Sequence, residues 1–282
     1  MIRKQLDHTQ VLQILPDRKP DSHKGDYGHI LLLCGSRGYT GAPELAAMGA
    51  LRSGAGLVYL GVPECIYTIE ATKLTEPIVI PLVSQGDTIS DKAISQICKL
   101  LPKMDAVLFG CGVGQSAGSL AVLEAIMEFC QCPLVLDADG INLLSRHMDL
   151  LRGRKHPTIL TPHHGEFARL KEFSPETREA DAVSFAKEMN CILLLKGHES
   201  LITDGQICYH NHTGNPGMAV GGNGDMLAGM ITAFLGQGLE PLESAAVAAW
   251  LHGAAGDLCA KEIGQYGMLP SDMLTVLPRL LK

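Results

Sequence analysis

The chain has 282 residues, of which 46% are hydrophobic and 19% are charged, with a formal net charge of −7 from 23 basic and 30 acidic residues. This length suits one large α/β domain with a sizeable core, and the acidic balance supplies no electrostatic footprint for nucleic acid. No apolar run approaches the roughly 20 residues that span a bilayer, and the first residues lack the apolar segment of a secretory signal, so we expect a cytoplasmic protein that binds neither nucleic acid nor membrane.

Seven apolar runs predict fully buried strands. Each run is continuous rather than alternating, which is the pattern of a parallel sheet covered on both faces. The runs lie at residues 29–35, 56–62, 77–83, 105–112, 132–140, 158–163 and 191–197. Helical patterns separate several of them, at residues 42–53, 91–104, 119–131 and 176–190. This alternation of strand and helix predicts βαβ units.

The pattern changes after the seventh run. Residues 201–210 read as a β-hairpin with Asp204 and Gly205 at its turn. Beyond it only helices are expected, at residues 225–236, 241–262 and 270–281. Residues 1–282 are therefore predicted to form a single α/β domain, in which a central, mostly parallel sheet has helices on both faces in three α/β/α layers.

A glycine-rich stretch precedes the first of these helices. Residues 213–224 contain five glycines and one proline, and Asp225 follows at once. Apolar residues recur at helical spacing after it, which places Asp225 at or near a helix N-cap. The small residues would expose backbone N–H groups to which a phosphate can bind. Asp225 is then either a capping residue or the group that accepts a proton from a hydroxyl meeting the phosphorus.

Polar clusters follow five of the predicted strands. Ligands of open parallel sheets bind outside the carboxyl ends of the strands, so these clusters are expected to meet along one edge of the sheet. They lie at residues 35–42, 110–114, 137–140, 161–166 and 196–200.

Five motifs in order along the chain resemble one known family. "GSRGYTGAPELAA", "DADGINLL", "TPHHGEFARL", "KGHESLITDG" and "NHTGNPGMAVGGNGD" are similar to those of the ADP-dependent NAD(P)H-hydrate dehydratases, a branch of the ribokinase-like superfamily. "GGNGD" alone would fit the vitamin-precursor kinases of that superfamily as well, whereas "NPGMAVGGNGD" and "TPHHGE" favour the dehydratases. The resemblance covers nearly the whole chain and implies the ribokinase-like fold.

The resemblance implies a repair reaction on a nucleotide cofactor. ADP would phosphorylate the ring hydroxyl of the S-epimer of NAD(P)H hydrate, and elimination would then give NAD(P)H, AMP and phosphate. Mg²⁺ would bridge phosphate oxygens. The family also implies a homo-oligomer, with a tetramer favoured. The chain is expected to be the form without an epimerase domain, so that a separate epimerase would act on the same metabolite.

The resemblance assigns roles residue by residue. Asp225 would be the catalytic base. The residues implied to bind the nucleotide are Lys196, Gly197, His198, Glu199, Ser200, Gly222, Asn223 and Gly224. Those implied to bind the hydrated nicotinamide nucleotide are Ala42, Gly112, Gly114, His163 and Asp225. Asn142 and Glu166 are our own inference as partners of the metal ion, through water. Asn223, His164 and Ser200 depart from the residues common in the family, but none of these departures removes the base or the phosphate cradle.

Four other interpretations stay open at this point. The chain could be a vitamin-precursor kinase of the same superfamily, or a nucleotide-binding sensor without catalysis. Residues 163–166, "HHGE", could hold zinc, although adjacent histidines on an extended segment point to opposite sides. Residues 110–116 imitate a dinucleotide fingerprint, but with the spacing GxGxG after the fourth strand rather than the first.

Several other residues have plainer readings. The nine cysteines show no CxxC pair and read as buried thiols of a reducing cytosol. His252 is expected to be a hydrogen-bonded histidine packed between helices, and Asp257 a structural hydrogen-bond acceptor.

Overall fold

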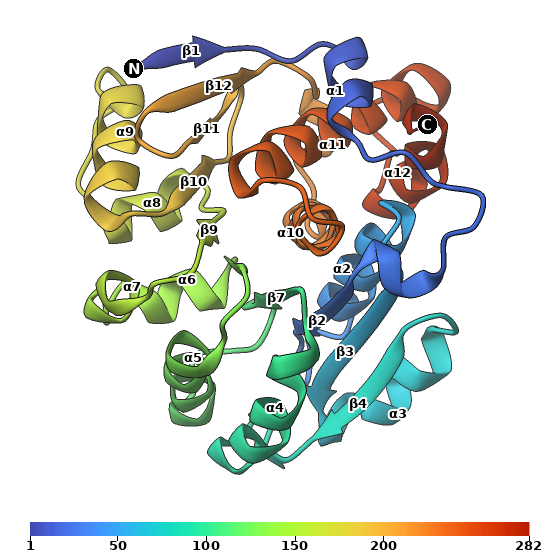
Figure 1. The fold of residues 1–282 in the computed structure, drawn as a ribbon, viewed down its shortest axis with the longest axis vertical. Helices are drawn as coiled ribbons and strands as arrows, with labels where there is room; N and C mark the ends of the chain where they lie inside the picture. Colours follow the sequence, from blue (N-terminus) through green and yellow to red (C-terminus); the bar gives the residue numbers. More distant parts are fainter. Residues whose placement is uncertain (282) are drawn as a thin grey trace.

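The computed structural model describes residues 1–281, which form three layers (Figure 1). A ten-stranded sheet lies in the middle, in the order β1-β12-β11-β10-β9-β8-β7-β2-β3-β4. Its strands are β1 (Ile2–Lys4), β2 (His29–Leu33), β3 (Leu57–Pro63), β4 (Ile78–Leu82), β7 (Ala106–Phe109), β8 (Leu134–Leu136), β9 (Thr158–Leu160), β10 (Ile192–Leu195), β11 (Ser200–Thr203) and β12 (Ile207–Asn211). A separate two-stranded ribbon pairs β5 (Ser84–Gln85) with β6 (Thr88–Ile89).

All seven predicted strands exist, and they pair in parallel with one another. The predicted hairpin is confirmed, because β11 and β12 are antiparallel and β10 pairs antiparallel with β11. The prediction that every strand is fully buried was wrong for β4. This strand lies at the edge of the sheet, and the side chain of Ile78 is 42% exposed. An apolar edge strand therefore looks the same in sequence as a central one.

Two apolar cores lie on opposite faces of the sheet. Successive residues of β2 alternate between them, with Ile30 and Leu32 in one and Leu31 and Leu33 in the other. The first core is covered by α1 (His8–Ile14), α2 (Gly41–Arg52), α3 (Glu64–Lys73), α10 (Asn223–Gly236), α11 (Pro241–Ile263) and α12 (Pro270–Val276). The second is covered by α4 (Ile94–Leu100), α5 (Ala117–Phe129), α6 (Asp139–Leu144), α7 (Asp149–Gly153), α8 (His164–Leu170) and α9 (Arg178–Met189). The predicted covering of both faces is confirmed.

The short elements were not predicted from the sequence. β1, α1, α3, α6, α7 and α8 were not predicted, and the expected helix at 91–104 is divided into 3₁₀ turns η2 (Asp91–Ala93) and η3 (Leu101–Lys103) on either side of α4. Most of these elements have seven residues or fewer, too few to display a period. Three further 3₁₀ turns are η1 (Lys24–Tyr27), η4 (Pro216–Met218) and η5 (Leu277–Leu280). Among residues 1–281, none of the helices combines the length and apolarity that a membrane crossing needs.

Helices α2 and α10 approach each other through glycines. A Cβ atom added at Gly49 would lie 2.5 Å from the carbonyl oxygen of Met226, and one added at Gly229 would lie 2.0 Å from that of Ala46. The backbones of the two helices are thus in direct contact over the sheet. This contact fixes α10, which follows the glycine-rich stretch.

Candidate active site

The polar clusters predicted at the strand ends meet along one edge of the sheet. Strands β2, β7, β8, β9 and β10 are parallel neighbours, so the segments that follow them leave on the same side. An isolated parallel bridge between His163 and Lys196 extends this pairing past β9 and β10. The expected convergence of the five clusters is confirmed.

Helix α10 starts at this edge with several unpaired amides. Gly222 is its N-cap with φ of 98°, a left-handed conformation that favours glycine. The first helical hydrogen bond runs from the amide of Met226 to the carbonyl of Gly222, at 3.1 Å. The amides of Gly222, Asn223 and Gly224 precede it and have no acceptor within the helix. Asp225 is the third helical residue, close to the N-cap as predicted but not the cap itself.

The side chain of Asn223 stabilises the approach to this helix. Its Nδ2 donates to the carbonyl oxygens of Met218, at 2.8 Å, and Val220, at 3.3 Å. The preceding segment is thereby tied to the first residue of α10. The side chain of Asn223 therefore stabilises the loop, and its backbone amide remains available to bind a ligand.

Asp225 lies in a cluster of buried polar groups. Its carboxylate, the carboxylate of Asp137 and the thiol of Cys111 have ligand atoms within 4.8 Å of one another. Burial first, and then the charge of Asp137, raise the pKa of Asp225 to about 6; a hydrogen bond with Cys111 and the charge of Lys196 oppose this shift only in part. A carboxylate with this pKa is a far better proton acceptor at neutral pH than an ordinary aspartate.

Asp137, for which no role was predicted, holds this cluster together. Its side chain is almost fully buried, and its Oδ1 accepts from Nζ of Lys196 at 2.7 Å and from Oγ1 of Thr161 at 2.7 Å. Burial alone would lower the pKa of Lys196, but the charges of Asp137 and Glu166 outweigh it and raise the pKa. Lys196 is therefore a fixed cation. In the sequence, Asp137 could have been found as a carboxylate that directly follows a buried strand, in "LVLDADG".

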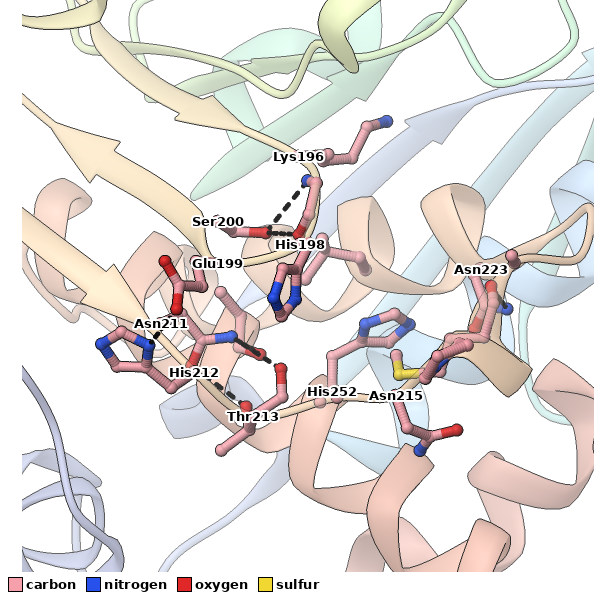
Figure 2. Close-up of a pocket in the computed structure, with 18 of the residues that line it drawn as sticks. Lys196, His198, Glu199, Ser200, Asn211, His212, Thr213, Asn215, Asn223 and His252 are labelled. Carbon is pink, nitrogen blue, oxygen red and sulfur yellow. Dashed lines mark hydrogen bonds and ion pairs between the residues drawn. The ribbon is translucent and has the colours of Figure 1, made fainter. Parts of the chain in front are cut away.

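A cavity of about 650 Å³ opens beside the start of α10 (Figure 2). Seven of the eight residues predicted to bind a nucleotide line it: Lys196, Gly197, His198, Glu199, Ser200, Asn223 and Gly224. Gly222 is not part of the lining. The lining also includes residues that the sequence analysis did not single out, among them Asn211, His212, Thr213, Asn215 and Leu227. The volume is that of a pocket for a nucleotide-sized ligand.

Hydrogen bonds between side chains and backbone hold the cavity wall. Ser200 donates from Oγ to the carbonyl of Gly197, at 3.2 Å, and accepts from the Gly197 amide at 3.3 Å. Asp257 of α11 accepts from the amide of Gly214 at 2.9 Å and from Nδ2 of Asn215 at 3.0 Å. The prediction that Asp257 is a structural acceptor is confirmed.

His252 of α11 lines the same cavity, and of the hydrogen bonds predicted for it one is present, with the backbone of Asn223. The residue is buried, with 7% of its surface exposed, but its Nε2 has no hydrogen-bond partner within residues 1–281. Burial and the charge of Lys196 lower the pKa of His252 to about 4. The histidine is therefore neutral, with one nitrogen unpaired toward the cavity that it lines.

This lowered pKa predicts a loss of stability in acid. An unfolded histidine has a pKa of about 6.5, so the unfolded chain binds more protons than the folded one between pH 6.5 and 4. The free energy of unfolding should fall by about 3 kcal/mol over this interval because of His252. His252→Gln should remove that contribution, whereas His156→Gln at an exposed site should keep it. Urea unfolding of the three proteins at several pH values measures the difference.

The residues predicted to bind the hydrated nucleotide lie outside the lining of this cavity. Ala42 and Gly112 are neighbours, since a Cβ added at Gly112 would lie 3.3 Å from that of Ala42. The amide of Gly114 donates to Oδ2 of Asp139 at 2.9 Å. His163 is the N-cap of α8, and its Nδ1 accepts from the amides of Gly165 and Glu166.

Asn142 and Glu166, inferred as partners of a metal ion, each have protein partners. Oδ1 of Asn142 accepts from Nη1 of Arg169 at 2.8 Å. Oε2 of Glu166 accepts from the amide of His163 at 2.9 Å, which completes a capping box. Because Nδ1 of His163 is used by the same cap, the zinc interpretation of "HHGE" loses support.

Comparison with known proteins agrees with this geometry. A family model for NAD(P)H-hydrate dehydratase matches residues 30–279. A bifunctional NAD(P)H-hydrate repair enzyme of Moorella thermoacetica is 40% identical over 275 residues, which cover 95% of this chain and 52% of that protein. The chain thus spans about half the length of such bifunctional relatives. An ADP-dependent (S)-NAD(P)H-hydrate dehydratase of Nitrosopumilus maritimus is 34% identical over 100% of this chain and 98% of its own length.

Solved structures confirm the ribokinase-like fold. A ribokinase-like superfamily protein of Enterococcus faecalis has a TM-score of 0.87 at 28% identity, covering 98% of this chain and 94% of its own. An ADP/ATP-dependent NAD(P)H-hydrate dehydratase of Bacillus subtilis, co-crystallised with ATP/Mg²⁺, has a TM-score of 0.83 at 29% identity, covering 97% of this chain and 96% of its own.

Proposed function

Because the chain belongs to the NAD(P)H-hydrate dehydratase family, we propose that it is a lyase that converts the S-epimer of NAD(P)H hydrate to NAD(P)H, with ADP as phosphoryl donor and AMP and phosphate as further products. The observation that carries this proposal is a carboxylate with a raised pKa, Asp225, on the first turn of a glycine-fronted helix beside a nucleotide-sized cavity. The name of the Nitrosopumilus relative supports ADP as the donor.

The first step transfers a phosphoryl group to the ring hydroxyl. The hydroxyl oxygen attacks the terminal phosphorus of ADP, and Asp225 takes the hydroxyl proton. The bond between that phosphorus and the oxygen of AMP breaks as the new bond forms. The amides of Gly222, Asn223 and Gly224 would bind the phosphoryl oxygens at the positive end of the α10 dipole.

The second step removes the phosphate. Hydroxide is a poor leaving group, whereas phosphate leaves readily when the lone pair of the ring nitrogen expels it and forms a carbon–nitrogen double bond. The neighbouring ring carbon then loses a proton to water, which restores the carbon–carbon double bond and the neutral ring. Lys196 lies next to the phosphate cradle, because a Cβ added at Gly224 would lie 3.2 Å from its Nζ. Its fixed positive charge, held by Asp137 at 2.7 Å, would stabilise the developing negative charge on the phosphate.

We propose Mg²⁺ as the cofactor. When bound, the ion would neutralise part of the charge of the phosphate groups. Asp137 offers a carboxylate oxygen beside the cradle, and carboxylate oxygens are ligands that Mg²⁺ prefers. We also propose that Asn142 and Glu166 contact the ion through water molecules. One side-chain oxygen of each already accepts a hydrogen bond, from Arg169 and from the amide of His163 respectively.

We also propose a cytoplasmic homo-oligomer, with a tetramer favoured, that works beside a separate epimerase. All nine cysteines are free, which supports a reducing compartment. Helix α11 is rich in alanine and glycine, which permits close helix packing, and sedimentation of the purified protein would give the number of subunits.

We propose that the nicotinamide end of the substrate lies near Asp225, Ala42 and Gly112, with Gly114 and His163 further along the predicted site.

The raised pKa of Asp225 predicts a pH profile. The base acts when deprotonated, so kcat/KM should fall below about pH 6. Asp137→Asn removes a neighbouring negative charge, which lowers the pKa of Asp225, and the fall should then occur at lower pH. Asp91→Asn, an exposed change, should leave the profile in place. A profile that Asp137→Asn does not move would contradict the assignment of Asp225 as the titrating base.

The function itself is tested by following the near-ultraviolet absorbance of reduced nicotinamide. Purified protein is mixed with NADH hydrate and Mg²⁺, together with ADP, with ATP or with neither. A rise that needs ADP supports the proposal in full, and a rise with ATP alone keeps the reaction but changes the donor. No rise with either, on folded protein, would favour a vitamin-precursor kinase instead.

A further inference from the structure

A second, smaller cavity lies apart from the nucleotide cavity. It has a volume of about 240 Å³ and is lined by Gln115, Asn142, Ser145, Arg146 and Arg169. None of these residues lines the larger cavity. We call it the arginine pocket. Its lining comes from the segment after β7, from α6 with the residues that follow it, and from α8.

Two arginines without carboxylate partners meet in this pocket. Within residues 1–281 the guanidinium of Arg146 has neither a hydrogen bond nor an ion pair, and that of Arg169 bonds only the amide oxygen of Asn142, at 2.8 Å. Four other arginines pair with carboxylates, as Arg3 does with Glu179, and Arg18, Arg154 and Arg178 donate to backbone carbonyls. Both side chains are exposed to solvent, and two guanidiniums that line one cavity without a carboxylate partner are placed to bind an anion together.

Among the remaining polar groups of the pocket, the side-chain amide of Asn142 offers a free donor. Oδ1 of Asn142 is taken by Arg169, which leaves its Nδ2 free to donate. Ser145 uses its hydroxyl proton on the carbonyl of Asn142, at 2.8 Å. Asp139 is the acidic group that contacts the lining, and its oxygens accept from Nε2 of Gln115, at 3.2 Å, and from the amide of Gly114, at 2.9 Å. Its negative charge weakens an anion site, and these bonds hold its carboxylate against Gly114 and Gln115.

The pocket adjoins the predicted substrate side of the active site. Gln115 directly follows Gly114, and both are bonded to Asp139, so the pocket continues the segment that the family resemblance assigns to the hydrated nucleotide. A guanidinium matches the geometry of a phosphate, with two parallel N–H groups. The phosphorylated form of the substrate differs from the other form by one phosphate monoester, on the 2′ position of the adenosine ribose.

We propose that the arginine pocket binds this 2′-phosphate and makes the protein prefer NADPH hydrate to NADH hydrate. The inference rests on the proposed function for the identity of the ligand. Arg146 would contribute most, because its guanidinium is free to bind in a bidentate manner. Arg169, whose guanidinium is held by the side chain of Asn142, would supply a second positive charge from α8.

The test uses NADP⁺ and NAD⁺ as unreactive probes, which separates binding from turnover. Their dissociation constants are measured by calorimetry with ADP present in excess to fill the larger cavity. NADP⁺ should bind at least about tenfold more tightly than NAD⁺, and Arg146→Gln should reduce that ratio by about tenfold through its effect on NADP⁺ alone. Arg152→Gln is the matched control, because Arg152 lies on the adjacent helix α7, outside the pocket lining, and pairs with Asp149 at 3.0 Å.

Three outcomes would overturn the inference. Equal affinities of the wild-type protein for the two probes would show that the 2′-phosphate is not recognised. An equal loss for both probes in Arg146→Gln would assign the pocket to a group that they share. Inorganic phosphate that binds the wild-type protein but not Arg146→Gln, with no preference between the probes, would assign the pocket to a free anion. A clear preference for NADP⁺ without any conversion of the hydrates would instead contradict the proposed function and leave the pocket assignment intact.

Discussion

Asp225→Asn is expected to lower kcat by a factor of about 1,000, within the range that general bases contribute. The change keeps the shape of the side chain and the burial of its surroundings, but an amide cannot take the proton of the ring hydroxyl. ADP should bind with unchanged or slightly higher affinity, because the substitution removes a negative charge from beside the phosphate cradle. This combination separates a catalytic carboxylate from a structural one.

Single-turnover formation of reduced nicotinamide measures the chemical step, and calorimetry measures the affinity for ADP. Asp149→Asn serves as the control, since the side chain of Asp149 is 97% exposed on α7 and should change neither quantity. Turnover that survives in Asp225→Asn would remove the proposed mechanism. Loss of ADP binding together with turnover would show that Asp225 stabilises the glycine-rich loop and is not the base.

Gly229→Ala is expected to destabilise the protein by about 3 kcal/mol or more, at the upper end of the cost of overpacking a core. The added Cβ would lie 2.0 Å from the carbonyl oxygen of Ala46, and a backbone atom in a packed helix cannot turn aside as a side chain can. The gain in helix propensity from glycine to alanine is only about 1 kcal/mol. Steric repulsion between α2 and α10 therefore dominates.

Gly41→Ala is the matched control, because it lies on the same helix pair and a Cβ there meets no atom within 4 Å. Its free energy of unfolding should stay within about 1 kcal/mol of the wild type. Urea unfolding curves of the three proteins measure both effects. Wild-type stability in Gly229→Ala would mean that α2 and α10 are not held in contact. If Gly229→Ala folds but is weakened, its turnover should fall too, since Asp225 lies one helical turn away.

Local patterns in the sequence were sufficient for the larger elements. The seven buried strands, the long helices and the hairpin at Asp204 and Gly205 could be predicted because each depends on residues close together in the chain, whose apolar period and turn chemistry are visible directly. Short elements such as α6 and α8 were missed, because seven residues or fewer carry little periodicity. Both helices are stabilised by packing on the sheet, and α8 also by a capping box.

The candidate site also has one part that the sequence determined and one part that only the fold decided. The sequence by itself determined a glycine-rich helix start with a carboxylate on its first turn, because Gly222, Gly224 and Asp225 lie within four residues of one another and the following helix sets their geometry. Only the tertiary structure decided the chemistry of that carboxylate. Asp137 and Lys196 reach Asp225 from different strands, and burial together with the charge of Asp137 raises its pKa. Charges and desolvation act through space, so their effect is fixed only when distant segments fold against one another.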